Sequence, residues 1–208
     1  MYQKLGLILS LGFALSPRLS LADPVDNPGD FVLAFDSGTL KLGNLDEMAI
    51  AAFSVSGTVL DGDGNVFIPA AAIILPDATV PAPIIGDVTV RFEPLADAIG
   101  TLNAVTGDAT AGLSVRVHLI NPLLPPGCAL TPVDIALTSG SDGGLTGIPY
   151  SMDDGTATYV NNSFAVPRSS GCGFFGGIID SQIGLPSPPP RNYVNNLHGT
   201  FDPIFTGS

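Results

Sequence analysis

The sequence predicts an all-β protein, an antiparallel β-sandwich of the immunoglobulin-like or jelly-roll-like kind with long loops rich in proline and glycine. Several segments alternate apolar and polar residues with a period of two, the pattern of strands buried on one face. Turn residues separate these segments, since the 208 residues include 25 glycines and 19 prolines. Glutamate, which favours helix interiors, occurs only at Glu47 and Glu93. Many short strands divided by turns are typical of sandwiches and barrels.

Residues 1–22 are interpreted as a secretory signal peptide. Lys4 supplies a positive n-region, residues 5–15 form an apolar run, and Ser20 and Ala22 place small residues before the expected cleavage near Ala22. The apolar run is too short to span a bilayer as a stable helix. We therefore expect a secreted or cell-surface protein with one domain over residues 23–208 and no transmembrane segment in the mature chain.

The charge of the mature chain excludes one class of partner. Lys4 and Arg18 lie in the signal segment, so five basic residues face 19 acidic residues beyond it, a formal charge of −14. A surface of this sign repels nucleic acid and anionic lipid headgroups. We expect no nucleic-acid partner, whereas an extracellular or cell-envelope protein partner remains compatible with the sequence.

Strict alternation predicts two strands in detail, over residues 88–93 and 113–119. Their apolar members are expected in the core: Val88, Val90, Phe92, Leu113, Val115, Val117 and Leu119. Arg91, Arg116 and His118 alternate with them and are expected to be more exposed. Further strands are predicted over 31–35, 39–42, 53–56, 71–75, 134–138, 157–160, 164–166 and 199–201, and one short helix near 178–183.

Two hairpins share their turn chemistry. Gly57 and Thr58 lead through an Asp- and Gly-rich turn into residues 66–68, and Gly100 and Thr101 lead through a similar turn into the strand that includes Leu113. Three other stretches are apolar without alternation, at residues 69–86, 122–133 and 173–190. We interpret these as covers over the open ends or edges of the sandwich, and the alternative is an exposed patch or a pocket for a lipid-like ligand.

Cys128 and Cys172 are the only cysteines. Two thiols in an oxidising compartment are usually joined, so we predict a disulfide between them, with Cα atoms about 4.4–6.8 Å apart. A zinc site is not expected, because two cysteines without a suitably spaced histidine pair do not supply its ligands.

Asp61, Asp63 and Asn65 resemble the opening of a calcium-binding loop, with oxygen ligands at alternate positions. An EF-hand would continue with Gly at position 6 and an acid at position 12, where this chain has Val66 and Ala72. A tight turn explains the same residues, and we favour it over a weak calcium site.

No other cluster defines a specific chemistry, and we predict no catalytic residues and no cofactor. Asp153 and Asp154 are adjacent and are first of all a turn signal. His118 and His198 lie in no recognisable motif. Asn161 opens a sequence that fits the N-glycosylation pattern.

The second half of the chain resembles a group of exported actinobacterial proteins of unknown function, over roughly residues 55–200. The motifs that carry the resemblance are Leu137-Thr138-Ser139-Gly140, Asn162-Ser163-Phe164-Ala165-Val166-Pro167, Gly171-Cys172-Gly173 and Gly184-Leu185-Pro186-Ser187, with Gly100-Thr101-Leu102 and Asn121-Pro122-Leu123-Leu124. The run Pro188-Pro189-Pro190-Arg191 departs from the pattern. The resemblance implies export and a linked cysteine pair, and it brings no activity, cofactor or catalytic residue.

Three functions follow from these observations, in order. The first is a secreted or cell-surface, non-catalytic β-sandwich that makes protein or envelope contacts. The second is a carrier or binding protein for a hydrophobic small molecule or lipid. The third is a carboxylate-dependent hydrolase, for which the sequence offers few general acids and bases. An enclosed apolar cavity would favour the second function over the first.

Overall fold

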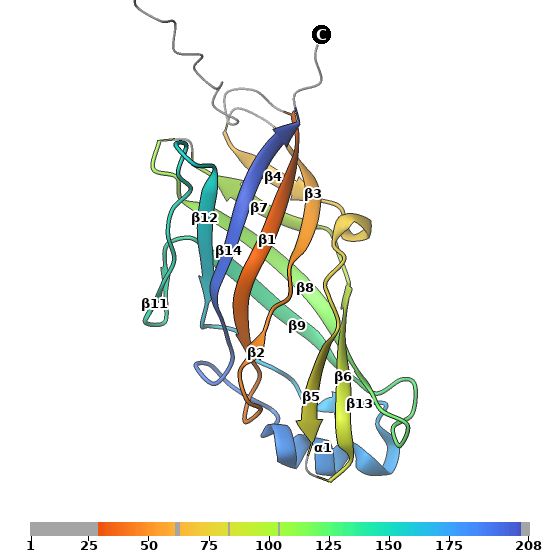
Figure 1. Cartoon of the computed structure of the whole chain (residues 1–208). Helices are drawn as coiled ribbons and strands as arrows, with labels where there is room; N and C mark the ends of the chain where they lie inside the picture. Colours follow the sequence, from red (N-terminus) through yellow and green to blue (C-terminus); the bar gives the residue numbers. More distant parts are fainter. Residues whose placement is uncertain (1–28, 61–62, 83, 104, 205–208) are drawn as a thin grey trace, which may run out of the picture.

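The computed structural model describes residues 29–60, 63–82, 84–103 and 105–204, so the predicted signal peptide lies outside the described residues. Eight strands form a closed antiparallel β-barrel (Figure 1). In order around the ring, these strands are β1 (Gly29–Lys41), β3 (Phe53–Val59), β4 (Asn65–Ile68), β7 (Ala98–Leu102), β8 (Ala109–Ile120), β9 (Ala129–Thr138), β12 (Thr156–Asn161) and β14 (Tyr193–Ile204).

The predicted β-sandwich is wrong, because the strands close into one ring and do not separate into two sheets. β9 pairs with β8 on one edge and meets β12 on the other, at Val160 opposite Thr138. β14 then joins β12 to β1 and completes the ring. Period-two alternation identifies the buried face of each strand. It does not tell whether that face meets a second sheet or curves around to meet itself.

Shorter elements complete the described structure. β2 (Met48–Ala49) pairs with β1, β5 (Ala78–Ala82) and β6 (Gly86–Pro94) form a hairpin on the second half of β8, and β13 (Ser169–Ser170) pairs with β9. β10 (Ser141–Asp142) and β11 (Leu145–Thr146) form a separate small hairpin. The helical elements are η1 (Ala70–Ala72), η2 (Gly173–Phe175) and α1 (Gly176–Ile183).

The two strands predicted in detail are present as β6 and β8, paired with Arg91 opposite His118. Five of the predicted core residues are at most 5% exposed: Val88, Val90, Val115, Val117 and Leu119. Phe92 and Leu113 point to the same side but are only half-buried, for a reason given below. The side chains of Arg91, Arg116 and His118 are more exposed than this core, as predicted.

Both predicted hairpins are confirmed as β3–β4 and β7–β8. Two predicted strands are wrong. Residues 71–75 form part of η1 and an extended segment, and residues 164–166 contribute only an isolated bridge between Val166 and Ser187. Phe164 and Val166 are buried, whereas in residues 71–75 only Ile73 is buried and Ile74 is 75% exposed. An apolar run without alternation does not by itself distinguish a strand from a loop.

The disulfide between Cys128 and Cys172 is present, with the Cα atoms 4.2 Å apart, slightly closer than predicted. It joins the loop before β9 to the start of η2. From there α1 extends across one end of the barrel, where Figure 1 shows it near the tip of the β5–β6 hairpin. Ile179 and Ile183 on α1 are buried, so this helix closes that end with apolar side chains.

Candidate functional site

The inner face of the barrel does not pack to a solid core. A cavity of about 160 Å³ lies inside it. Barrels of eight strands are wide enough either to be filled by side chains or to hold one small ligand. The larger side chains around the cavity are Phe31, Leu33, Phe35, Leu40, Met48, Ile50, Phe53, Val55, Val66, Ile68, Ile73, Leu75, Phe92, Leu102, Leu113, Val115, Ile135, Leu137, Tyr150, Tyr159, Val194, Leu197 and Phe201.

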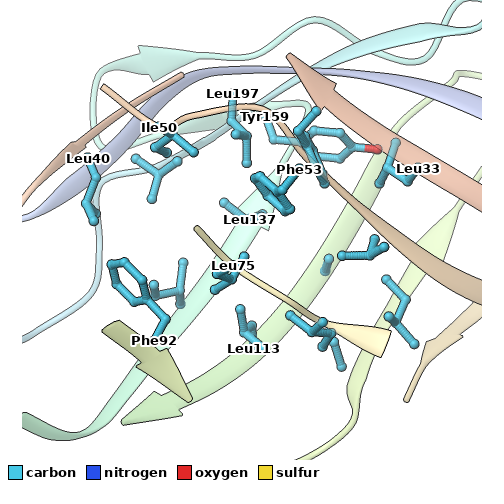
Figure 2. Close-up of a pocket in the computed structure, with 18 of the residues that line it drawn as sticks. Leu33, Leu40, Ile50, Phe53, Leu75, Phe92, Leu113, Leu137, Tyr159 and Leu197 are labelled. Carbon is cyan, nitrogen blue, oxygen red and sulfur yellow. The ribbon is translucent and has the colours of Figure 1, made fainter. Parts of the chain in front are cut away.

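The lining is almost entirely apolar, and it comes from every strand of the ring. Figure 2 shows Leu40 and Leu33 of β1, Phe53 of β3, Leu113 of β8 and Leu137 of β9 arranged around the open space. Each of these residues occupies the inward position of its strand's alternation. The residues that lie at the inward positions of this alternation therefore also form the wall of the cavity.

Several inward-facing side chains keep accessible surface although they belong to the core cluster. Phe53, Phe92, Leu113, Ile135 and Leu137 are only half-buried, and all five line the cavity. Protein interiors normally pack as densely as organic crystals, so apolar side chains pointing inward would otherwise be covered. We attribute this residual exposure of Phe92 and Leu113 to the cavity that both residues line.

The wall of the barrel is incomplete beside β3. This strand pairs with β4 only at Thr58 and Val59, so its first half, from Phe53, has no partner strand on that edge within the described residues. The segment over residues 69–77 covers this gap. Leu75, from this segment, lies across the cavity in Figure 2.

This covering segment is fixed at both ends by polar contacts at the protein surface. The Ala70 amide donates to the Asp97 carboxylate over 2.8 Å. At the other end the Arg91 guanidinium donates three hydrogen bonds to the Asp77 carboxylate, at 2.7, 3.0 and 3.1 Å, and it holds the pKa of that carboxyl below its usual value. Part of the apolar stretch at residues 69–86 therefore forms a wall of the cavity, as the interpretation of that stretch as a pocket requires.

Polar groups are scarce around the cavity. Asp77 is already paired with Arg91, and Thr101 and Thr110 bond to each other through their hydroxyls over 2.9 Å. Tyr150 and Tyr159 supply the phenolic groups. Burial, with the nearby Tyr150, raises the pKa of Tyr159 to about 12, so its hydroxyl stays protonated at physiological pH.

The structure places the other sequence-derived candidates away from this cavity. Asp63 lies in the turn between β3 and β4, Asn65 is the first residue of β4, and Asp61 lies outside the described residues, so the weak calcium site stays untested. Asp154 accepts hydrogen bonds from Thr156, the bonding expected of a turn, and these bonds lower its pKa. Within the described residues, no group of three or more His, Cys, Asp or Glu side chains could hold a metal ion.

Both histidines contact carboxylates at the protein surface. His118 lies 2.7 Å from Glu93, which also accepts a bond from Arg116, and His198 lies 3.0 Å from Asp36. Neither histidine lines the cavity.

The glycosylation sequon is blocked by the fold. Asn161 is 1% exposed, and its side-chain amide donates to the backbone oxygen of Ala136 at 2.8 Å and to Asp142 at 2.9 Å. A glycan on this nitrogen would break both hydrogen bonds and has no room in the folded chain.

Sequence reasoning did not single out Tyr159. It lies in a predicted strand, but its role depends on its inward direction and on the unfilled space beside it. Comparisons with known protein families, with curated proteins and with solved structures found no match. The resemblance to exported actinobacterial proteins stays a prediction. In the part of the chain that the structure describes, no helix is long and apolar enough to cross a membrane.

Proposed function

We propose that this protein is a binding protein or carrier for a small hydrophobic molecule, held inside the barrel. The observation that carries the proposal is the apolar cavity, whose lining side chains remain partly exposed in an otherwise buried core. This was the second of the three functions that the sequence suggested. The disulfide and the predicted signal peptide support an extracellular place of action.

An unfilled cavity has an energetic cost, which supports a role for it. Cavity-creating substitutions lose about 24 cal/mol per Å³, so a space of 160 Å³ corresponds to on the order of 4 kcal/mol of folding free energy. Larger side chains at inward positions such as Ala109 and Ala111 would fill the space. A bound apolar molecule would recover the lost contacts. An engineered apolar cavity of about 150 Å³ stays dry and binds benzene, so a ligand of similar size fits here.

The proposal predicts that toluene stabilises the protein against heat. At ten times its dissociation constant, a ligand that binds only the folded state adds about 1.4 kcal/mol, which raises Tm by about 3–6 °C for a chain of this size. Ala111→Phe places a ring in the cavity and should abolish this rise. Differential scanning calorimetry with and without toluene measures both effects.

Ala136→Phe is the matched control. Ala136 lies on β9 opposite Gly112 of β8 and is exposed on the outer face, so a ring there leaves the cavity open. The control should keep the toluene response of the wild type. Equal toluene responses in both variants would contradict binding inside the barrel, and no response in the wild type would contradict the proposed function itself.

The contact-protein and hydrolase hypotheses remain predictions of lower rank. Ile84, Leu123 and Phe174 are exposed apolar side chains, but no observation on the described residues identifies a partner that would cover them. The carboxylates of Asp153 and Asp154 lie at an exposed turn and not in a cleft.

A further inference from the structure

We infer that the ligand is an uncharged molecule with one oxygen that accepts a hydrogen bond, and that Tyr159 is the residue that selects it. This inference rests on the proposed function and specifies the chemistry of the ligand. It depends on three features: the position of the Tyr159 hydroxyl, the absence of a protein partner for it, and the lack of a suitable countercharge around the cavity.

Tyr159 is fixed in the wall of the cavity by its neighbours. It is 8% exposed, its backbone pairs with Leu197 of β14, and its ring meets the ring of Phe35 edge-on with 6.0 Å between centroids. In Figure 2 its hydroxyl oxygen is directed toward Leu33, and it is the only polar atom on the labelled side chains. The hydroxyl therefore has a defined position among apolar groups.

This hydroxyl has no hydrogen-bond partner among the described residues. It is not one of the fully buried polar atoms without a partner, so its oxygen keeps some accessible surface. Tyrosine hydroxyls among apolar groups usually find a partner, because loss of hydrogen bonding to water without a replacement is costly. Phenylalanine would fill the same position without that cost. Since the hydroxyl stays protonated, it has a proton to donate. A ligand oxygen, such as that of a ketone, an aldehyde or an ether, would complete the bond.

The electrostatics of the cavity exclude charged ligands. No lysine, arginine or histidine belongs to the described residues that line it. A carboxylate would enter a low-dielectric space lined by two tyrosines and by no cation, and burial of an unpaired charge costs far more than a hydrogen bond returns. The carboxyl of Asp77 is already paired with Arg91, so a cationic ligand finds no free partner there either.

Two ligands of the same shape test the inference: cyclohexanone and methylenecyclohexane, which differ by an oxygen in place of a CH₂ group. Binding of each to the wild type and to Tyr159→Phe, measured by titration calorimetry, forms a double-mutant cycle. We expect Tyr159→Phe to weaken the binding of cyclohexanone by about tenfold and to change the affinity for methylenecyclohexane by less than about twofold. The cycle cancels the different hydrophobicity of the two probes.

Tyr193→Phe is the control for loss of a tyrosine hydroxyl elsewhere. Tyr193 lies on β14, its hydroxyl donates to Glu47 at the surface, and it does not line the cavity. This variant should bind both probes as the wild type does. Cyclohexanecarboxylate is the charged probe, and we expect it to bind at least about 100-fold more weakly than cyclohexanone.

The outcomes separate the inference from the proposed function. If both neutral probes bind and Tyr159→Phe affects them equally, the barrel is a binding site but Tyr159 does not select an oxygen, and the inference is wrong. Binding of the carboxylate as tightly as the ketone would also overturn it. If neither neutral probe binds to the wild type, the proposed function fails as well.

Discussion

Cys128→Ser should lower the free energy of unfolding by about 4 kcal/mol, within the usual range of about 2–5 kcal/mol for loss of a native disulfide. The two cysteines are 44 residues apart in sequence, so the bond removes a large loop-closure entropy from the unfolded chain. In the folded chain both cysteines are at most 2% exposed. Their bond holds η2 and α1 against the start of β9.

The loss of stability should be greatest in the segment that the disulfide holds in place. Amide exchange is expected to accelerate across α1, whereas the strands of the ring keep their protection at room temperature. Urea denaturation measures the global change. Cys128→Ser combined with Cys172→Ser serves as the control, because it removes the unpaired thiol and should show the same loss. Two labelled thiols per chain in unreduced, denatured wild type would contradict the bond and the oxidising compartment together.

Gly100→Ala should destabilise the protein by about 3 kcal/mol, the upper part of the usual range for overpacking. Gly100 lies on β7 opposite Ala111 of β8. A Cβ atom at this position would collide with the backbone oxygen of Thr110 and approach the Ala111 Cα atom to 3.1 Å. Backbone atoms cannot rotate away as a side chain does, so β7 and β8 would have to separate. Both strands belong to the ring, and their separation would open the barrel.

Gly112→Ala is the matched control for this substitution. Gly112 lies on the neighbouring strand, opposite Ile99, and its added Cβ would find only the Ile99 backbone oxygen at an ordinary 3.6 Å. We expect a change within about 1 kcal/mol, in the stabilising direction if the alanine restricts the unfolded chain. Urea denaturation of both variants gives the comparison. Equal stabilities for the two alanine variants would contradict the close approach of β7 and β8.

The sequence anticipated more of this fold than the error in architecture suggests. The alternation over Val88–Phe92 and Leu113–Leu119 assigned the inward face of β6 and β8 correctly. The turn chemistry after Gly57 and Gly100 located two hairpins, and the presence of only two cysteines predicted the disulfide between them. These features depend on local periodicity, on turn residues or on the number of cysteines, and each of them can be recognised directly in the sequence.

The candidate site could not be predicted in the same way. A cavity is the volume that remains unfilled after all inward-facing side chains have packed, and no single segment of the sequence carries that information. Leu75 illustrates this, because it lies in a stretch predicted as a strand and becomes part of the wall through the path of residues 69–77. Asn161 shows the converse, since its sequon is a local pattern and its burial is a tertiary fact.

By itself, the sequence determined that the chain is all-β, that its strands bury one face each, and that Cys128 and Cys172 are joined. Only the tertiary structure decided that the strands close into a barrel, that the barrel holds an apolar cavity, and that Tyr159 lines it. The physical reason is the range of the interactions. Alternation and turns are set by neighbours in the chain. Closure requires β9 to meet β12, and it requires β14 to meet β1 at positions such as Thr39 and Asn195, which lie 156 residues apart.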